Sequence, residues 1–181
     1  GARHFSPASL PGAAGHTLSF WSFSKGFGMA SWRVGYLLYP EALAEALNKV
    51  QDTNLICAPV ASQLVALAAT RAGRGAVQAR LDGLGAVRRA VHDRLRSLGS
   101  RIEFVPTRGA FYVLVRLPPV DEPLAFSRAM VERFRVATIP GFAFGLDPAL
   151  GNYQRVSFGA LEPSAVSEGL DRFVAAVRAL C

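Results

Sequence analysis

Cysteine, histidine and lysine are scarce in this sequence of 181 residues. Its two cysteines, Cys57 and Cys181, have no CxxC spacing and are too few for a disulfide framework. The three histidines stand at no metal-ligand spacing from one another or from the cysteines. We therefore expect no metal site and no disulfide scaffold, and we expect a cytoplasmic location.

A long uninterrupted hydrophobic run is also absent. The longest uncharged stretch with a helical pattern, residues 55–70, contains Pro59, Ser62 and Gln63 and is shorter than the ~20 residues of a bilayer span. Intrinsic disorder is excluded, because 51% of the residues are hydrophobic and only 18% are charged. The sequence predicts a soluble globular chain with no membrane partner.

Only Lys25 and Lys49 are lysines among 20 basic residues, which outnumber 13 acidic residues and give a net charge of +7. A bias in the coding sequence explains the predominance of arginine. The two retained lysines are still informative, because lysine can lose its proton near neutral pH whereas arginine cannot. They are the first positions to inspect for chemistry.

Short apolar runs alternate with segments whose apolar residues recur at steps of three and four. The expected strands are residues 18–23, 34–39, 101–105, 110–117, 135–139 and 155–161, and the expected helices are residues 41–50, 59–71, 76–98, 123–134 and 163–180. Such a mixture predicts an α/β or α+β architecture. The long central helix suggests two structural parts that meet around residues 71–76.

Arginines crowd the predicted helix 76–98, and they all lie off its apolar stripe. They are Arg80, Arg88, Arg89, Arg94 and Arg96. A nucleic-acid surface would combine such charges with aromatic side chains that stack on bases, and none are interleaved here. We therefore favour a solvated helix face and expect no nucleic-acid partner.

Residues 22–35, SFSKGFGMASWRVG, place two serines, a lysine and an arginine around a glycine-containing loop. The hydroxyls of Ser22 and Ser24 can donate hydrogen bonds to phosphate oxygens, and Arg33 offers a planar, permanently charged fork for a dianion. With Arg33 serving the phosphate, Lys25 is left over. An amine beside a phosphate site is what a Schiff-base enzyme requires.

This stretch resembles the lysine signature of the class I/II pyridoxal-phosphate aminotransferases of fold type I, except that Ser31 stands where the family usually has glycine. We expect a slightly altered loop there. Four later segments are also similar to the family: residues 51–63, 107–117 with GAFY, 136–145 and 153–161. Residues 153–161 look like the segment whose arginine grips the substrate α-carboxylate.

The resemblance implies pyridoxal 5'-phosphate as cofactor and transfer of an amino group between an amino acid and a 2-oxo acid. Lys25 would form the Schiff base with the cofactor and then move the proton at the substrate Cα. Ser22, Ser24 and Arg33 would hold the phosphate, and Arg155 would bind the carboxylate. The aromatic residues nearby are expected to pack rather than contact substrate; they are Trp32, Tyr112 and Phe142.

The family's partners for the cofactor ring precede the lysine segment, and here no acidic residue occurs before Glu41. The resemblance therefore implies the C-terminal half of such an enzyme, truncated at the N-terminus. Residues 1–73 would end the large cofactor domain, and residues 74–181 would form the α/β small domain. We expect this part alone to be inactive and prone to aggregation, and the full-length protein to be a homodimer.

Two other functions of the same fold remain open. A decarboxylase, lyase or synthase of fold type I would use the same Lys25, Ser22 and Arg33. A transcriptional regulator could carry the fold as an effector domain that binds the cofactor. A third alternative, a basic binding module, would require the lysine signature to be a coincidence.

Overall fold

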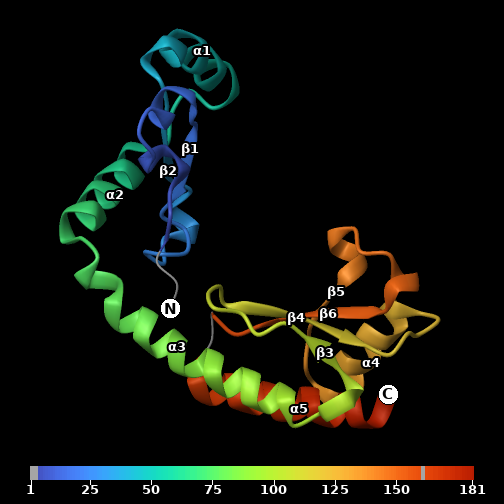
Figure 1. The fold of residues 1–181 in the computed structure, drawn as a ribbon. Helices are drawn as coiled ribbons and strands as arrows, with labels where there is room; N and C mark the ends of the chain where they lie inside the picture. Colours follow the sequence, from blue (N-terminus) through green and yellow to red (C-terminus); the bar gives the residue numbers. More distant parts are fainter. Residues whose placement is uncertain (1–3, 160–161) are drawn as a thin grey trace. The chain divides into compact units, whose positions relative to one another are not determined.

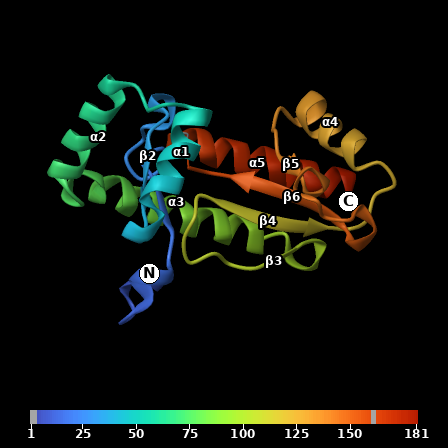
Figure 2. The same cartoon turned by 90° about the horizontal axis from the view of Figure 1, so that it is seen from above.

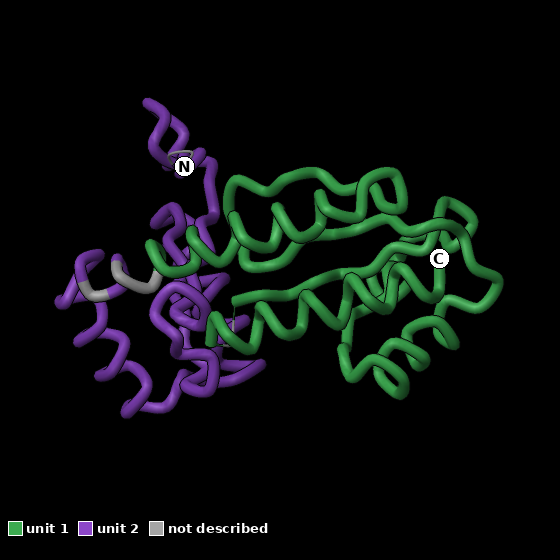
Figure 3. Tube along the Cα trace, turned by 90° about the horizontal axis from the view of Figure 1, so that it is seen from below, with its two compact units in different colours: residues 1–2, 81–181 green, residues 3–80 purple. Residues whose placement is uncertain are grey.

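The computed structural model describes residues 4–159 and 162–181 (Figure 1). The chain forms two compact units, one ending at Arg80 and the other comprising Leu81–Cys181 (Figure 3). Within the described residues, no helix combines the length and the apolar character needed to cross a membrane.

The unit that ends at Arg80 is built on an antiparallel pair of strands, β1 (Ser19–Ser22) and β2 (Gly35–Leu38). Two helices follow, α1 (Ala44–Asn54) and α2 (Val60–Ala72). Gly73 ends α2 at a positive φ of 69°, which a residue without a Cβ adopts readily. All four elements lie where the sequence predicts them, within a few residues.

The other unit, Leu81–Cys181, is green in Figure 3 and is called the second unit because it follows in the chain. It contains a four-stranded antiparallel sheet in the order β3-β4-β6-β5. The strands are β3 (Glu103–Phe104), β4 (Tyr112–Leu117), β5 (Ile139–Pro140) and β6 (Asn152–Ser157). The helices are α3 (Gly75–Arg96), which begins in the first unit, α4 (Pro123–Phe134) and α5 (Pro163–Leu180). Helices α3 and α5 lie on the same side of strands β4 and β6 (Figures 1 and 2).

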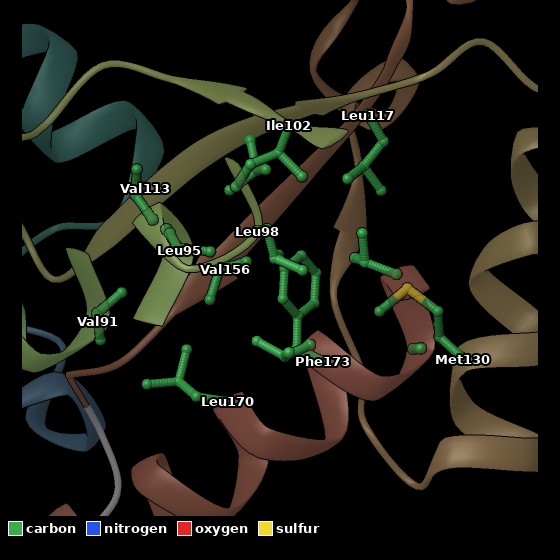
Figure 4. Close-up of a cluster of buried hydrophobic side chains, with 14 of the residues drawn as sticks. Val91, Leu95, Leu98, Ile102, Val113, Leu117, Met130, Val156, Leu170 and Phe173 are labelled. Carbon is green, nitrogen blue, oxygen red and sulfur yellow. The ribbon is translucent and has the colours of Figure 1, made fainter. Parts of the chain in front are cut away.

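The alternation of side chains along β4 separates the core from an open face. Val113, Val115 and Leu117 are buried among side chains of α3 and α5, including Leu95 and Phe173 (Figure 4). The alternate residues of the strand point to the other side, because successive side chains of a strand alternate. One face of the sheet is therefore covered by helices, and the other carries Tyr112, Leu114 and Arg116 of β4.

The arginines of α3 that the structure describes include two that are ion-paired. Arg94 Nη2 lies 2.6 Å from Asp171 Oδ1 on α5, and Arg96 Nη1 lies 2.7 Å from Asp93 Oδ1. The side chain of Arg80 lies outside the described residues. Exposed pairs of this kind each contribute about 0–1 kcal/mol to the free energy of unfolding, so they add little to the stability of the fold.

The predicted strand 155–161 is wrong in its bounds, because β6 runs from Asn152 to Ser157. The predicted range left out Asn152 and Gln154, two polar residues that the structure buries. Gln154 Nε2 donates to Asn152 Oδ1 at 2.8 Å, and Thr138 Oγ1 donates to Gln154 Oε1 at 2.7 Å. These hydrogen bonds offset the cost of burying the amides. Residues 160–161 of the prediction lie outside the described residues.

The predicted strand 135–139 also begins too early, since β5 contains only Ile139–Pro140. Arg135 follows α4 in the left-handed conformation, at φ 55°, and its N–H bonds back to the carbonyls of Met130 and Val131. The Val136 N–H also bonds to Met130 O, at 3.2 Å. Because this cap occupies the backbone at the end of α4, strand pairing can start only beyond it.

His92 on α3 is a buried titratable residue in the second unit, at 7% exposure. Its Nε2 lies 3.3 Å from Thr107 Oγ1, and its ring packs against Phe104. Burial lowers the pKa of the imidazole from 6.5; Arg96 and Arg88 lower it further, and Asp93 partly opposes them. The fold therefore favours the neutral ring.

We expect the free energy of unfolding to fall as the pH drops below about 6.5, because the unfolded chain then binds a proton that buried His92 resists. Urea unfolding measured at a series of pH values checks this. A His92→Gln variant should show a shallower pH dependence, and a His16→Gln variant should match the parent because His16 is exposed. Equal slopes for all three proteins would contradict the expectation.

Candidate functional site

Lys25 lies on the loop between β1 and β2, and this loop is anchored by two buried side chains. Phe23 and Met29 are 7% and 5% exposed and flank the lysine. The N–H groups of Phe27 and Met29 both donate to Phe23 O, at 3.3 Å, and Gly28 N donates to Lys25 O at 3.3 Å. Main-chain hydrogen bonds within the loop thus fix its conformation, and Lys25 is exposed on it.

The two serines lie at the start of the same loop. Ser22 ends β1, and its Oγ accepts a hydrogen bond from the backbone N–H of Ser24 at 3.1 Å. Because a hydroxyl that accepts one bond can still donate its proton, Ser22 can serve an anion at the same time. Ser22 is exposed and Ser24 is half-buried, so both hydroxyls are within reach of a ligand at the surface of this loop.

Arg33 closes the loop in a left-handed conformation, at φ 49°. Its Nη1 donates to Ala30 O at 2.8 Å, which holds the guanidinium against the preceding turn. Ser31 belongs to a 3-10 turn, Ala30–Trp32. That turn is right-handed, so a serine is accommodated there without strain. The serine in place of the family's glycine therefore does not strain the turn that precedes Arg33.

Gly35 pairs with Ser22 at the end of the hairpin. A Cβ at this position would lie 2.5 Å from Trp21 O, which is closer than atoms of these types can approach. The glycine after the arginine therefore allows the two strands to meet at the base of the lysine loop.

Replacing Gly35 with alanine is expected to destabilise the chain by about 2 kcal/mol, because backbone must move to admit the Cβ. Equilibrium unfolding in urea measures the change. Gly26→Ala is the matched control, since a Cβ there would meet nothing within 4 Å. Equal stabilities of the two variants would show that the hairpin tolerates a side chain at its base.

Arg155 lies in the other unit, on β6, and projects to the open face of the sheet. Its Cζ lies 5.2 Å from the centroid of the Tyr112 ring and 4.7 Å from that of Phe144. All three line a hollow of about 970 Å³, together with Leu114, Tyr153 and others. Arg155 Nε is buried and has no hydrogen-bond partner among the described residues. The terminal nitrogens of the guanidinium remain available to an anionic ligand in the hollow.

The structure thus gathers Ser22, Ser24, Lys25 and Arg33 on one loop and places Arg155 in the second unit. Two hydroxyls, an ammonium and a guanidinium on one exposed loop match the chemistry of a phosphate-bearing aldehyde. Sequence reasoning missed the contact of Arg155 with Phe144. The only sequence signal for it is the aromatic repeat in residues 141–145, GFAFG.

The family model described as aminotransferase class I and II matches residues 5–173. The chain is 36% identical over 151 residues to aromatic aminotransferase ISS1 of Arabidopsis thaliana, covering 81% of this chain and 37% of that protein. It is 32% identical over 179 residues to an aspartate aminotransferase of Pyrococcus abyssi, covering 97% of this chain and 45% of that protein.

The fold matches as well. The crystal structure of an aromatic aminotransferase from Pyrococcus horikoshii aligns with 99% of this chain and 48% of its own, at a TM-score of 0.85 and 32% identity. The chain therefore spans less than half the length of each of these relatives. These matches confirm the resemblance and the fold class. The chain belongs to the class I and II aminotransferases, pyridoxal phosphate-dependent enzymes of fold type I.

Proposed function

We propose that the protein carrying this chain transfers an amino group between an amino acid and a 2-oxo acid, using pyridoxal 5'-phosphate. The observation that carries the proposal is the loop between β1 and β2, where an exposed lysine lies with two hydroxyls and an arginine. Within these residues Lys25 is the amine to which the cofactor would be attached covalently.

Each side chain has a distinct part in this proposal. Ser22 and Ser24 would donate to phosphate oxygens, and the charge of Arg33 would offset part of the charge of the dianion, so that this loop would hold the cofactor by its phosphate. When bound, pyridoxal phosphate supplies a ring that withdraws electrons from the substrate Cα. Once the substrate's amino group has displaced it from the cofactor, the amine of Lys25 would take the proton from that Cα as a base and then give it back as an acid.

Arg155 is the proposed site for the substrate α-carboxylate, since its terminal nitrogens can form the bidentate pair that arginine makes with carboxylates. A reaction that keeps this carboxylate intact fits such an anchor, which favours amino-group transfer over decarboxylation. These residues place no restriction on the side chain of the amino-acid substrate.

The experiment that tests the proposal follows the fate of the amino acid on the whole protein loaded with cofactor. Transamination converts the amino acid to its 2-oxo acid and leaves the amino group on the cofactor, without release of carbon dioxide. Mass spectrometry of the products and a carbon dioxide assay separate the two reactions. Release of carbon dioxide in place of the 2-oxo acid would overturn the proposal in favour of a decarboxylase.

We further propose that residues 1–73 belong to the cofactor domain and residues 74–181 to the small domain of a cytoplasmic homodimer. Both proposals rest on the resemblance to the family. Light scattering on the whole protein is expected to give the mass of two subunits. The mass of a single subunit would contradict the dimer.

A further inference from the structure

We infer that Tyr112 and Phe144 are positioning residues for Arg155: their rings fix its guanidinium so that its terminal nitrogens face a carboxylate. This inference deepens the proposed function, on which the identity of the ligand rests. The aromatic pair, Tyr112 and Phe144, comes from two different elements, β4 and the 3-10 turn Gly141–Phe144.

The guanidinium of Arg155 contacts both aromatic rings. Arg155 Cζ is within 6 Å of both ring centroids, at 5.2 Å for Tyr112 and 4.7 Å for Phe144, which is the range of a cation–π interaction. Two such contacts restrict the rotamers of a side chain that otherwise has great conformational freedom. The charge is therefore held in one place before any ligand arrives.

The Nε atom of Arg155 is not available to a ligand. This atom is buried and lacks a partner among the described residues, although it carries a proton that can donate. Arg155 nevertheless lines the hollow of about 970 Å³. The donors left for a ligand in that hollow are Nη1 and Nη2, so a carboxylate approaches the guanidinium through its terminal nitrogens.

Both rings are placed by main-chain contacts with the strand that carries Arg155. In the register of β4 and β6, Leu114 lies opposite Arg155 and Tyr112 opposite Ser157. Tyr112 is thus a diagonal neighbour of the arginine, a separation that an aromatic side chain can bridge. The ring position follows from the pairing of the strands rather than from a mobile loop.

Phe144 is tied to the same strand from the other side. Ile139 of β5 pairs with Arg155, and the turn begins directly after β5. A Cβ on Gly141 would lie 2.5 Å from Tyr153 Cβ, so only a glycine lets the turn approach β6 this closely. Gly145 then ends the turn at φ 81°, with its N–H bonded to Phe142 O at 3.0 Å.

The exposure of the rings sets the size of the expected effect. Tyr112 and Phe144 are 41% and 50% exposed, so each contact is that of a partly solvated cation–π pair. Removal of one ring is expected to weaken carboxylate binding about threefold, and removal of both about tenfold. Water then competes for the guanidinium, which has more rotamers to lose when the ligand binds.

The test uses the whole protein that carries this chain, in two measurements. The first, without ligand, is the hydrogen-exchange rate of the Arg155 Nε–H by NMR. The second is the dissociation constant of 3-phenylpropionate, a plain monocarboxylate. The variants are Phe144→Leu, Tyr112→Leu and their combination, with Phe144→Tyr as the rescue. Phe142→Leu is the matched control, because Phe142 is on the same turn, is 42% exposed and makes no ring contact with Arg155 among the described residues.

We expect exchange of the Arg155 Nε–H to accelerate and binding to weaken in the leucine variants, while Phe144→Tyr and Phe142→Leu resemble the parent. Unchanged exchange in the double variant overturns the positioning role, whatever the ligand does. The proposed function fails separately: if Arg155→Met leaves the dissociation constant of 3-phenylpropionate unchanged, Arg155 is not the carboxylate anchor. Even then, accelerated exchange of the Arg155 Nε–H in the leucine variants supports the positioning role of Tyr112 and Phe144.

Discussion

Replacing Lys25 with alanine is expected to lower kcat for amino-group transfer by about 10⁴-fold, because a positioned acid–base group contributes up to that factor. No neighbouring side chain on this loop can take over, because Arg33 has no acceptor for a proton and Ser22 and Ser24 are hydroxyls. Steady-state kinetics of the whole protein with an amino acid and a 2-oxo acid measure the loss.

Lys49→Ala is the control that separates chemistry from charge. Lys49 is the other lysine, and its Nζ pairs with Glu45 Oε1 at 2.7 Å on the surface of α1. Its removal changes the net charge by the same amount, but it breaks only an exposed pair of small energetic value. Loss of activity in both variants, or in neither, would contradict the role proposed for Lys25.

Replacing Arg155 with methionine is expected to raise KM for the amino acid about a hundredfold or more. A bidentate guanidinium–carboxylate pair contains two charge-assisted hydrogen bonds, each contributing about 1.5–3 kcal/mol, and every 1.4 kcal/mol is a factor of ten. The same ratio should appear for the 2-oxo acid, because both substrates carry the carboxylate. Initial rates over a wide range of substrate concentration give KM and kcat separately.

The control for Arg155 is Arg178→Met, which removes an exposed charge from the last turn of α5 in the same unit. Arg155→Lys is also informative, because lysine keeps the charge and lacks the planar fork. It is expected to remain well below the parent in kcat/KM. Full activity of Arg155→Met would place the carboxylate elsewhere.

Local signals in the sequence were sufficient for the helices and for the lysine loop. Pro123 and Pro163 mark the first turns of α4 and α5, where their missing N–H costs nothing, and both helices have the predicted bounds. The loop around Lys25 follows from short-range spacing, and its hydrogen bonds are also short-range.

Tertiary contacts account for what the sequence did not predict. Gln154 is polar and wholly buried, because Thr138 reaches it from 16 residues away. The ring of Phe144 meets Arg155 only after β5, the turn and β6 have come together. Tyr112 was expected to pack, and it lies half-exposed against Arg155. No local pattern encodes a pairing of this kind.

The central claim is that Lys25 is the amine that binds the cofactor, and covalent trapping tests it most directly. The protein is incubated with pyridoxal phosphate, reduced with borohydride and digested, and the modified peptides are identified by mass spectrometry. With two lysines in these 181 residues, each occupies its own peptide after cleavage at Arg. The account predicts reduction at Lys25 and none at Lys49. Equal labelling of both, or labelling of Lys49 alone, would contradict it.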